Sequence, residues 1–414
     1  MVDVEARARS DPPRPSIQLQ PPLVLHVLPS FAVGGVPART TEIINYFGDA
    51  FRHAIVALDG NYACGDRLAD TAQVDFPFLK NAAKQIVGSL LSSHVMLRRL
   101  RPDLLLTYNW GTIEWALANT IFPVCRHIHL EDGFGLEEAD GQLTRRVLFR
   151  RIALARTAGV VVPSETLVRL ATQTWKLPPG KVIHIPNGVD CSRFAQVPAA
   201  GAKLGCQRSA DELIVGTVAP LRPEKNLGFL LETFAAIAMQ FDAKLVIVGD
   251  GSERPKLTQL AKMLDIADRV HFTGHVEAVE TVLTYFDVFA LTSRTEQMPF
   301  SVLQAMAAGK PIAAVDIGDV KRMLSPENRA LVTPKGDLPA FAETLSHLLK
   351  DSAARDQIGR QNRGHVRKHY PRERMLEAYR KLFEAVPHGR ETQDRKATLP
   401  AGRPDQESHN FSDV

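Results

Sequence analysis

The chain alternates short β-branched runs with longer amphipathic stretches, and it does so twice. From about residue 22 to residue 195 the apolar runs have the length of buried strands, and the stretches between them have helical spacing. The pattern restarts after residue 212 and continues to about residue 370. Such alternation is typical of a parallel sheet with helices on both faces. The sequence therefore predicts an α/β protein in which two doubly wound, Rossmann-like domains face each other across a cleft.

The expected domains are residues 22–195 and 212–370, joined by a hinge over residues 196–211. The predicted strands cover residues 23–28, 53–58, 104–107, 125–129, 160–162 and 182–185, then 214–218, 244–248, 270–272, 288–291, 312–314 and 330–332. The predicted helices include residues 36–47, 87–100, 227–240, 253–264, 278–285, 301–308 and 339–369. We expect a last helix within residues 371–388 to cross back to the first domain. Charged, proline-bearing or polar ends at residues 1–21 and 389–414 indicate disordered tails.

Composition narrows the class of protein. The 414 residues carry a net charge of +4, which is too little for a dedicated nucleic-acid binder. The four cysteines form no C-x-x-C pair, which disfavours a zinc finger or a disulfide scaffold. Neither a membrane span nor a signal peptide is evident, so we expect a cytoplasmic protein.

Two glycine-rich turns follow predicted strands. Gly34 and Gly35 follow the first strand, and the segment V-G-D-G-S-E-R places Gly249 and Gly251 after a strand of the second domain. Each turn leads into a helix whose N-terminal N–H groups could hold a phosphate, although a tight turn alone would need the same residues. Neither turn reads G-x-G-x-x-G and no Walker lysine follows, which disfavours a dinucleotide enzyme or an NTPase.

Charged residues also gather at predicted strand ends. Arg222 and Lys225 follow the strand 214–218 and could neutralise a diphosphate, or they could lie on a solvated loop. Glu296 follows the strand 288–291, and Ser301 could cap the helix that carries Gln304. Because ligands of doubly wound sheets bind at the carboxyl ends of strands, we expect these groups to line the cleft.

These motifs fall in a recognisable order from residue 23 to about residue 386. They are the Gly34-Gly35 loop, a strand-ending histidine, V-V-P-S, I-P-N-G-V-D, R-P-E-K-N, G-D-G-S-E-R, F-T-G-H-V and an E-x₇-E-like segment that begins at Glu296. The ordered set resembles the retaining, nucleotide-sugar-dependent glycosyltransferases of family 4, which have the GT-B fold.

The resemblance implies a role for each matching residue. Lys225 and Arg222 would bind the diphosphate of the donor, and Glu296 would contact the hydroxyls of the transferred sugar. His129 would lie near that sugar. His127, two residues earlier on the same strand face, is the alternative candidate for this role. The other donor-binding positions implied are Gly34, Gly35, Gly249, Gly251, Gly274, His275, Val276, Met298, Pro299, Phe300, Ser301 and Gln304. The acceptor would meet the first domain near Asn109, Trp110, Glu131 and Asp132.

Two positions depart from the family pattern. Pro220 stands where the family usually has an arginine, and Gln304 stands where the second glutamate normally holds the ribose. These departures keep open a degenerate nucleotide-sugar-binding subunit, and the shared fold keeps open a nucleotide-sugar epimerase. A glycosidase would need paired carboxylates and would leave the phosphate loops unexplained. The chain contains no D-x-D, so we expect no metal. We also expect no cofactor, because the nucleotide sugar is a substrate. The expected partners are that nucleotide sugar and a glycan or lipid-linked acceptor.

One basic stretch could seat the protein on a membrane. Five arginines between residues 143 and 156 alternate with apolar residues, and Arg98, Arg99 and Arg101 end another predicted helix. Basic residues beside apolar ones on a helix can bind anionic lipid, whereas the plainer interpretation is a solvated face over a core stripe. The sequence thus allows a peripheral position on the inner face of a membrane.

Overall fold

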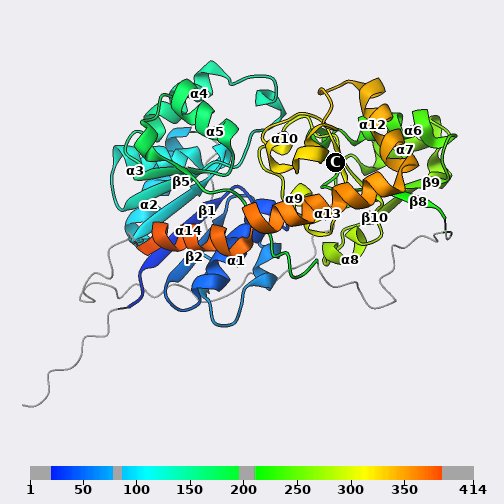
Figure 1. Ribbon diagram of the computed structural model, residues 1–414. Helices are drawn as coiled ribbons and strands as arrows, with labels where there is room; N and C mark the ends of the chain where they lie inside the picture. The colour runs from blue at the N-terminus through cyan, green and yellow to red at the C-terminus, as the bar shows by residue number, and fades with distance from the viewer. Residues whose placement is uncertain (1–19, 78–85, 195–208, 210, 385–414) are drawn as a thin grey trace, which may run out of the picture.

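The computed structural model describes residues 20–77, 86–194, 209 and 211–384 (Figure 1). It contains two parallel sheets, which lie side by side. The predicted tails 1–21 and 389–414 and the predicted hinge 196–211 fall almost entirely outside the described residues, so these expectations stay predictions.

The first sheet has seven parallel strands in the order β3-β2-β1-β4-β5-β6-β7. Its strands are β1 (Leu23–Leu28), β2 (Arg52–Ala57), β3 (Gln73–Asp75), β4 (Leu104–Tyr108), β5 (Arg126–Leu130), β6 (Gly159–Val162) and β7 (Val182–His184). In register, Leu23 of β1 pairs with Arg52 of β2, and Val24 pairs with Leu104 of β4. This strand order is that of a nucleotide-binding doubly wound sheet. The sequence pattern does not reveal β3, because this edge strand has only three residues.

The second sheet has five parallel strands in the order β10-β9-β8-β11-β12. Its strands are β8 (Leu213–Val218), β9 (Ala243–Val248), β10 (Val270–Gly274), β11 (Val288–Leu291) and β12 (Ile312–Ala314). With both sheets parallel and flanked by helices, the prediction of two doubly wound domains is confirmed.

Helices cover both faces of the first sheet. The larger helices of this domain are α1 (Gly35–Phe47), α2 (Ile86–Leu100), α3 (Ile113–Ile121), α4 (Thr144–Ala153) and α5 (Glu165–Arg169). Val24 and Leu28 of β1 pack toward α1, whereas Leu25 and Val27 pack toward α2 and α3. Because alternate side chains of a strand point to opposite faces, one apolar strand supplies two cores.

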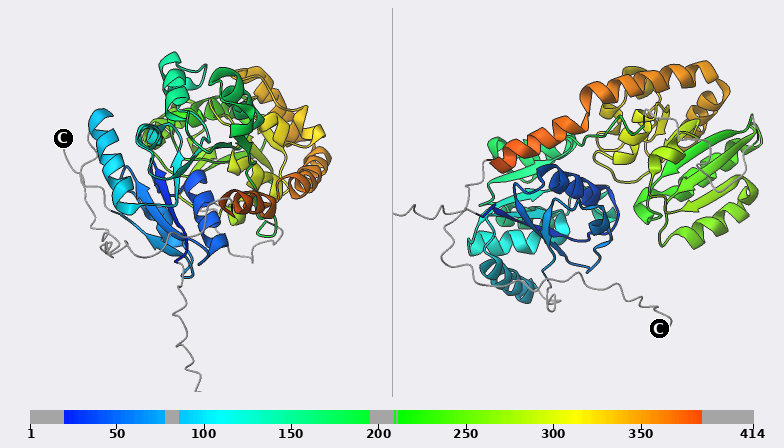
Figure 2. Two further views of the ribbon diagram at one scale, coloured as in Figure 1. Left: turned by 90° about the vertical axis from the view of Figure 1, so that its left-hand side faces the viewer. Right: turned by 90° about the horizontal axis from the view of Figure 1, so that it is seen from below.

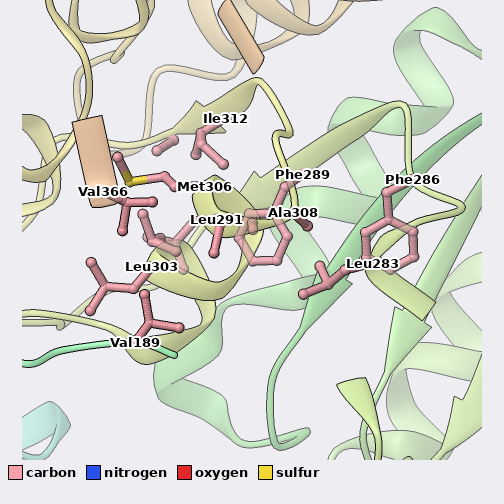
Figure 3. Close-up of a cluster of buried hydrophobic side chains, with 14 of the residues drawn as sticks. Val189, Leu283, Phe286, Phe289, Leu291, Leu303, Met306, Ala308, Ile312 and Val366 are labelled. Atoms are coloured by element: carbon pink, nitrogen blue, oxygen red, sulfur yellow. The ribbon is translucent and has the colours of Figure 1, made fainter. Parts of the chain in front are cut away.

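The second domain is built in the same way. Its helices are α6 (Leu227–Ala238), α7 (Arg254–Met263), α8 (Val279–Leu283), α9 (Phe300–Ala307), α10 (Val320–Met323), α11 (Pro326–Arg329), α12 (Leu338–Lys350) and α13 (Ser352–His369). Leu303 and Met306 of α9 lie beside Val366 of α13, and Val189, which arrives from the first domain, joins the same cluster (Figure 3).

The last helix, α14 (Arg372–Glu384), packs against the first domain. It follows α13 after Tyr370 and Pro371, and the two helices run along one edge of both domains (Figure 2). Val189 N–H donates to Tyr370 O at 3.0 Å, and Arg372 N–H donates to Val189 O at 3.1 Å. Five buried side chains of α14 join the core beneath α1: Met375, Leu376, Tyr379, Leu382 and Phe383.

Two predicted elements are wrong. Residues 330–332 form no strand, because the side-chain amide of Asn328 occupies the edge of β12: it accepts from Ile312 N at 2.9 Å and donates to Ile312 O at 2.7 Å. Only one bridge follows, between Val315 and Thr333. The predicted helix 339–369 is divided at Asp351, whose carboxylate accepts from Ala354 N at 2.9 Å and so caps α13.

Candidate functional site

Lys225 and Glu296 form an ion pair at the carboxyl end of the second sheet. Lys225 Nζ lies 2.5 Å from Glu296 Oε1, and Ser293 Oγ donates to the same oxygen at 3.0 Å. The two residues meet because their loops follow β8 and β11, which are neighbours in the sheet. Thr292 Oγ1 ties the loops together by donating to Lys225 O at 3.2 Å. Two of the three predicted catalytic residues are thus in contact.

The second glycine turn supports the loop that carries these cations. Leu221 N–H donates to Asp250 O and Glu253 N–H donates to Leu221 O, at 2.9 and 3.0 Å. Gly249 has φ +134°, and a Cβ there would lie 2.0 Å from Ala219 O. These glycines, Gly251 included, therefore allow one backbone to approach another. Arg222 lies on this loop with its side chain exposed.

The segment expected to border a nucleotide base lies next to this turn. Gly249 N–H donates to Gly274 O at 2.9 Å. Beyond Gly274, His275 is exposed and Val276 is half-buried against the core. The loops that follow β8, β9 and β10 are thereby hydrogen-bonded into one surface.

The first glycine loop meets the start of α9 across the domain interface. A Cβ at Gly35 would lie 3.1 Å from Cδ2 of Phe300, so this residue leaves room for the aromatic ring. The prediction that Ser301 caps α9 is wrong: Pro299 occupies the N-cap position, and Ser301 lies inside the first turn. Gln304, one turn further along, is half-buried.

His129 points into the first domain. Thr107 Oγ1 lies 2.8 Å from His129 Nδ1 and 2.7 Å from His127 Nε2, so one hydroxyl serves both predicted histidines. Burial lowers the pKa of His127 well below its ordinary value, and the adjacent His129 lowers it further. His129 Nε2 lies 3.8 Å from the buried carboxylate of Glu131, which has no hydrogen-bond partner among the described residues. The described residues show no contact between His129 and the Lys225–Glu296 pair.

Asp132 is held in a buried ion pair with Arg39 of α1. The guanidinium binds both carboxylate oxygens at 2.5 and 2.7 Å. Burial alone would lower the pKa of Arg39, but the attraction of Asp132 outweighs it and raises that pKa above its ordinary value. Asn109 Oδ1 accepts from Asp132 N at 2.7 Å. Asp132 is thus fixed at the carboxyl end of β5, with its charge neutralised.

Trp110 is engaged in packing around a buried arginine. The guanidinium of Arg150 lies 4.9 to 5.2 Å from the ring centres of Trp110, Phe134 and Trp175. Glu138 pairs with Arg150 through two bonds, at 3.0 and 2.8 Å. In this part of the predicted acceptor side, three aromatic rings therefore pack around a paired arginine.

The sequence did not indicate two polar residues at the domain interface: Asn187, which bonds to the second domain, and Arg39, which bonds to Asn187. Asn187, in the I-P-N-G-V-D segment, accepts from Arg39 NH1 at 2.9 Å and donates from Nδ2 to Met298 O at 2.8 Å. Since an arginine only donates and a carbonyl only accepts, the two bonds fix the orientation of this amide. Arg39 could have been found, because it lies four residues before Ile43 on the apolar side of the helix, where a charge needs a partner.

A second interdomain contact lies beyond Glu296. Gln297 Oε1 accepts from Ser164 Oγ at 3.1 Å. Asp319 accepts from Glu165 N at 2.6 Å and from Thr166 N at 3.1 Å, so it caps α5 from the other domain. The chain that follows the predicted sugar-binding carboxylate is therefore held by the first domain.

A pocket of about 380 Å³ opens beside the Lys225 loop. It is lined by Asn226, Gly228, Phe229, Glu232, Arg294, Lys335 and Gly336. Lys335 reaches Asp140 of the first domain at 2.7 Å. Within the described ranges, no group of three or more His, Cys, Asp or Glu side chains is arranged to hold a metal ion.

Known proteins share the two-domain fold of this chain. The Anabaena protein HepE, solved in complex with UDP-glucose, has a TM-score of 0.72 and 17% identity, and the match covers 88% of this chain and all of that one. The two domains and their facing loops thus define a GT-B glycosyltransferase fold. Residues 33–193 match the model described as Glycosyltransferase Family 4, and residues 212–351 match that of Glycosyl transferases group 1. The chain belongs to the family 4 glycosyltransferases.

Two curated relatives show the breadth of that family. N-acetyl-alpha-D-glucosaminyl L-malate synthase of Bacillus anthracis is 30% identical over 178 residues, which are 43% of this chain and 47% of the relative. A GDP-mannose-dependent phosphatidylinositol monomannoside mannosyltransferase of Mycobacterium tuberculosis is 31% identical over 217 residues, 50% of this chain and 56% of the relative. The chain spans about half the length of these relatives.

Proposed function

We propose that this glycosyltransferase moves a sugar from a nucleoside diphosphate sugar to an acceptor hydroxyl, with retention at the anomeric carbon. The observation that carries the proposal is the Lys225–Glu296 pair at adjoining strand ends. An ammonium group suits a leaving diphosphate, and a carboxylate beside it suits the hydroxyls of the sugar. In the absence of a donor, each group neutralises the other.

The chemistry requires stabilisation of a leaving group more than a strong base. As the sugar becomes oxocarbenium-like, negative charge grows on the diphosphate, where Lys225, exposed Arg222 and the N–H groups that open α9 would stabilise it. A departing phosphate oxygen would take the proton of the acceptor on the same face. Glu296 would orient the sugar, with His129 at the end of β5 completing the site from the first domain.

The substrates belong to the same proposal. HepE was solved with UDP-glucose, and one relative is named for a phosphatidylinositol-linked acceptor, which supports a nucleotide sugar and a glycan or lipid-linked acceptor. We place the reaction in cell-surface polysaccharide or glycolipid synthesis, in the cytoplasm or on the inner face of its membrane. The reaction would need neither a metal nor a cofactor, and turnover that persists in excess chelator would support this part.

A panel of nucleoside diphosphate sugars tests the proposal. A thermal-shift screen identifies the donor, and its hydrolysis or transfer is then measured for wild type, Lys225→Ala and Lys256→Ala. Loss of the Lys225 cation should lower kcat/KM about 10²- to 10³-fold. Lys256, an exposed lysine paired with Glu253, is the matched control and should have no effect. Wild-type turnover by the Lys225 variant would refute the assignment.

Two other outcomes would identify the alternatives. An epimerised sugar released without acceptor would indicate an epimerase of this fold. Nucleotide binding without turnover would indicate a degenerate subunit. Pro220 and Gln304, which depart from the family pattern, are the residues that favour this alternative. Restoring the family residue with Gln304→Glu should then tighten nucleotide binding, because hydrogen bonds to a charged acceptor are about twice as strong as neutral ones.

A further inference from the structure

Large apolar side chains are exposed together on the outer side of the first domain. Of the eleven large hydrophobic residues exposed among the described residues, six lie on α2, at the end of α3 and on α4. We call this set the flank surface: Leu91, Val95, Ile121, Phe122, Leu148 and Ile152, each between 48% and 64% exposed. On α2 and on α4 the two members are four residues apart, so each pair lies on one face of its helix.

The helices that carry the flank surface pack against one another. Helix α3 packs against both α2 and α4, and the three helices lie on the side of the first domain away from the second (Figure 1). The ring of Phe122 lies 5.0 Å from that of His94, on the same side of α2 as Leu91. Thr120 Oγ1 donates to Ala153 O at 2.6 Å, which joins the end of α3 to α4 beside Ile152.

The two outer helices of the flank surface, α2 and α4, carry positive charge only. Neither α2 nor α4 contains an aspartate or a glutamate. The structure corrects the simple prediction of a basic helix, because Arg150 is fully buried and Arg146 pairs with Glu137 and Glu138. The exposed arginines that remain carry no carboxylate partner among the described residues: Arg98, Arg99, Arg101, Arg145, Arg151 and Arg156. Arg151 and Arg156 donate to backbone carbonyls, which leaves their charge uncompensated.

We propose that the flank surface docks on a membrane rich in anionic lipid. Hydrocarbon receives the six apolar side chains, while acidic headgroups face the arginines around them. No helix of the described residues is long and apolar enough to cross a bilayer. On this membrane surface the proposed transferase would meet a lipid-linked acceptor. The inference therefore rests on the proposed function and adds the surface through which the protein binds the membrane.

The test is vesicle flotation of the full chain. Vesicles of phosphatidylcholine with phosphatidylglycerol are compared with phosphatidylcholine alone, at low and at high salt. We expect flotation with the anionic vesicles only, and less of it at high salt, since each arginine near an anionic surface contributes about fivefold in affinity. A chain that fails to float with anionic vesicles at low salt would overturn the proposal.

Matched variants locate the surface. Leu91→Glu with Leu148→Glu should reduce flotation at least about tenfold, whereas Met239→Glu with Met263→Glu should not. The two methionines are 90% and 68% exposed on the second domain, so the control makes the same change of charge and polarity elsewhere. Equal flotation by both double variants would also overturn the proposal. So would a wild-type dimer that only the flank variant turns into a monomer, because the surface would then be an interface between copies.

Vesicle binding and sugar transfer are separate readouts. The flank residues lie outside the predicted donor site, so nucleotide-sugar hydrolysis in solution should be the same for wild type and both double variants. Flotation without hydrolysis would refute the proposed function alone, and hydrolysis without flotation would refute membrane docking alone.

Discussion

Breaking the Arg39–Asp132 pair should strongly destabilise the first domain. Arg39 is 2% exposed and the side chain of Asp132 is 10% exposed, and two hydrogen bonds join them. Asp132→Asn keeps the shape and one acceptor oxygen, but it removes the negative charge that balances the guanidinium. Arg39→Met keeps the length but leaves the carboxylate without a cation. Removing one member of a buried pair costs about 3–5 kcal/mol, because the other charge stays buried.

The double variant distinguishes an ion pair from two independent packing effects. With both charges gone, the remaining penalty is mainly imperfect packing. The summed losses of unfolding free energy in the two single variants should therefore exceed the loss in the double variant by about 2 kcal/mol or more. Arg380→Met is the control: this arginine of α14 pairs with Glu377 and Glu384 but is 42% exposed, and its loss should cost under about 1 kcal/mol.

Tryptophan fluorescence in a urea titration measures this free energy in the right domain. All three tryptophans lie in the first domain, at positions 110, 115 and 175. The signal therefore reports the unfolding of that domain without a contribution from the second. If Arg39→Met costs no more than Arg380→Met, or if the two single changes are additive, the pair does not hold the domain as argued.

Two further predictions concern acid stability and a glycine. Burial lowers the pKa of His26, His53 and His127, that of His53 to about 3, and a neighbouring histidine lowers the other two further. These histidines bind protons only after unfolding, so stability is complete above about pH 6.5 and falls by up to roughly 4 kcal/mol per pH unit below it. Equal urea midpoints at about pH 7.5 and about pH 5 would contradict this. Gly249→Ala should lower the free energy of unfolding by at least about 2 kcal/mol and weaken nucleotide binding, because the added Cβ would lie 2.0 Å from Ala219 O. Thermal unfolding measures the loss of stability. Gly336→Ala is the control, since Gly336 also has a positive φ but its Cβ would lie in open space.

The fold was predictable because it rests on local periodicity. Buried strands and amphipathic helices leave their spacing in the sequence, and parallel sheets bring the ends of distant strands to one edge. That rule placed Lys225 and Glu296, which are 71 positions apart, at the same edge of the sheet, although it did not predict that they pair. The rule failed where a side chain competes with the backbone, as Asn328 does at the edge of β12.

Side-chain partners across the domain interface were not predictable in this way. Asn187 and Met298 are 111 positions apart, and their hydrogen bond depends on how two complete domains meet. The same holds for Arg150, which belongs to a basic stretch by sequence but to a buried aromatic cage by structure. Spacing shows which face a residue occupies, and the partner on that face comes from elsewhere in the chain.

The return of α14 to the first domain has a consequence for synthesis. The core beneath α1 includes Met375, Tyr379 and Phe383, so it lacks these side chains until residue 383 has left the ribosome. The strands of the second domain and its helices through α13 are complete at residue 369. They therefore do not depend on α14. The domain that is made first is therefore completed last, and its unfinished apolar face is exposed to chaperones and proteases while the second domain folds.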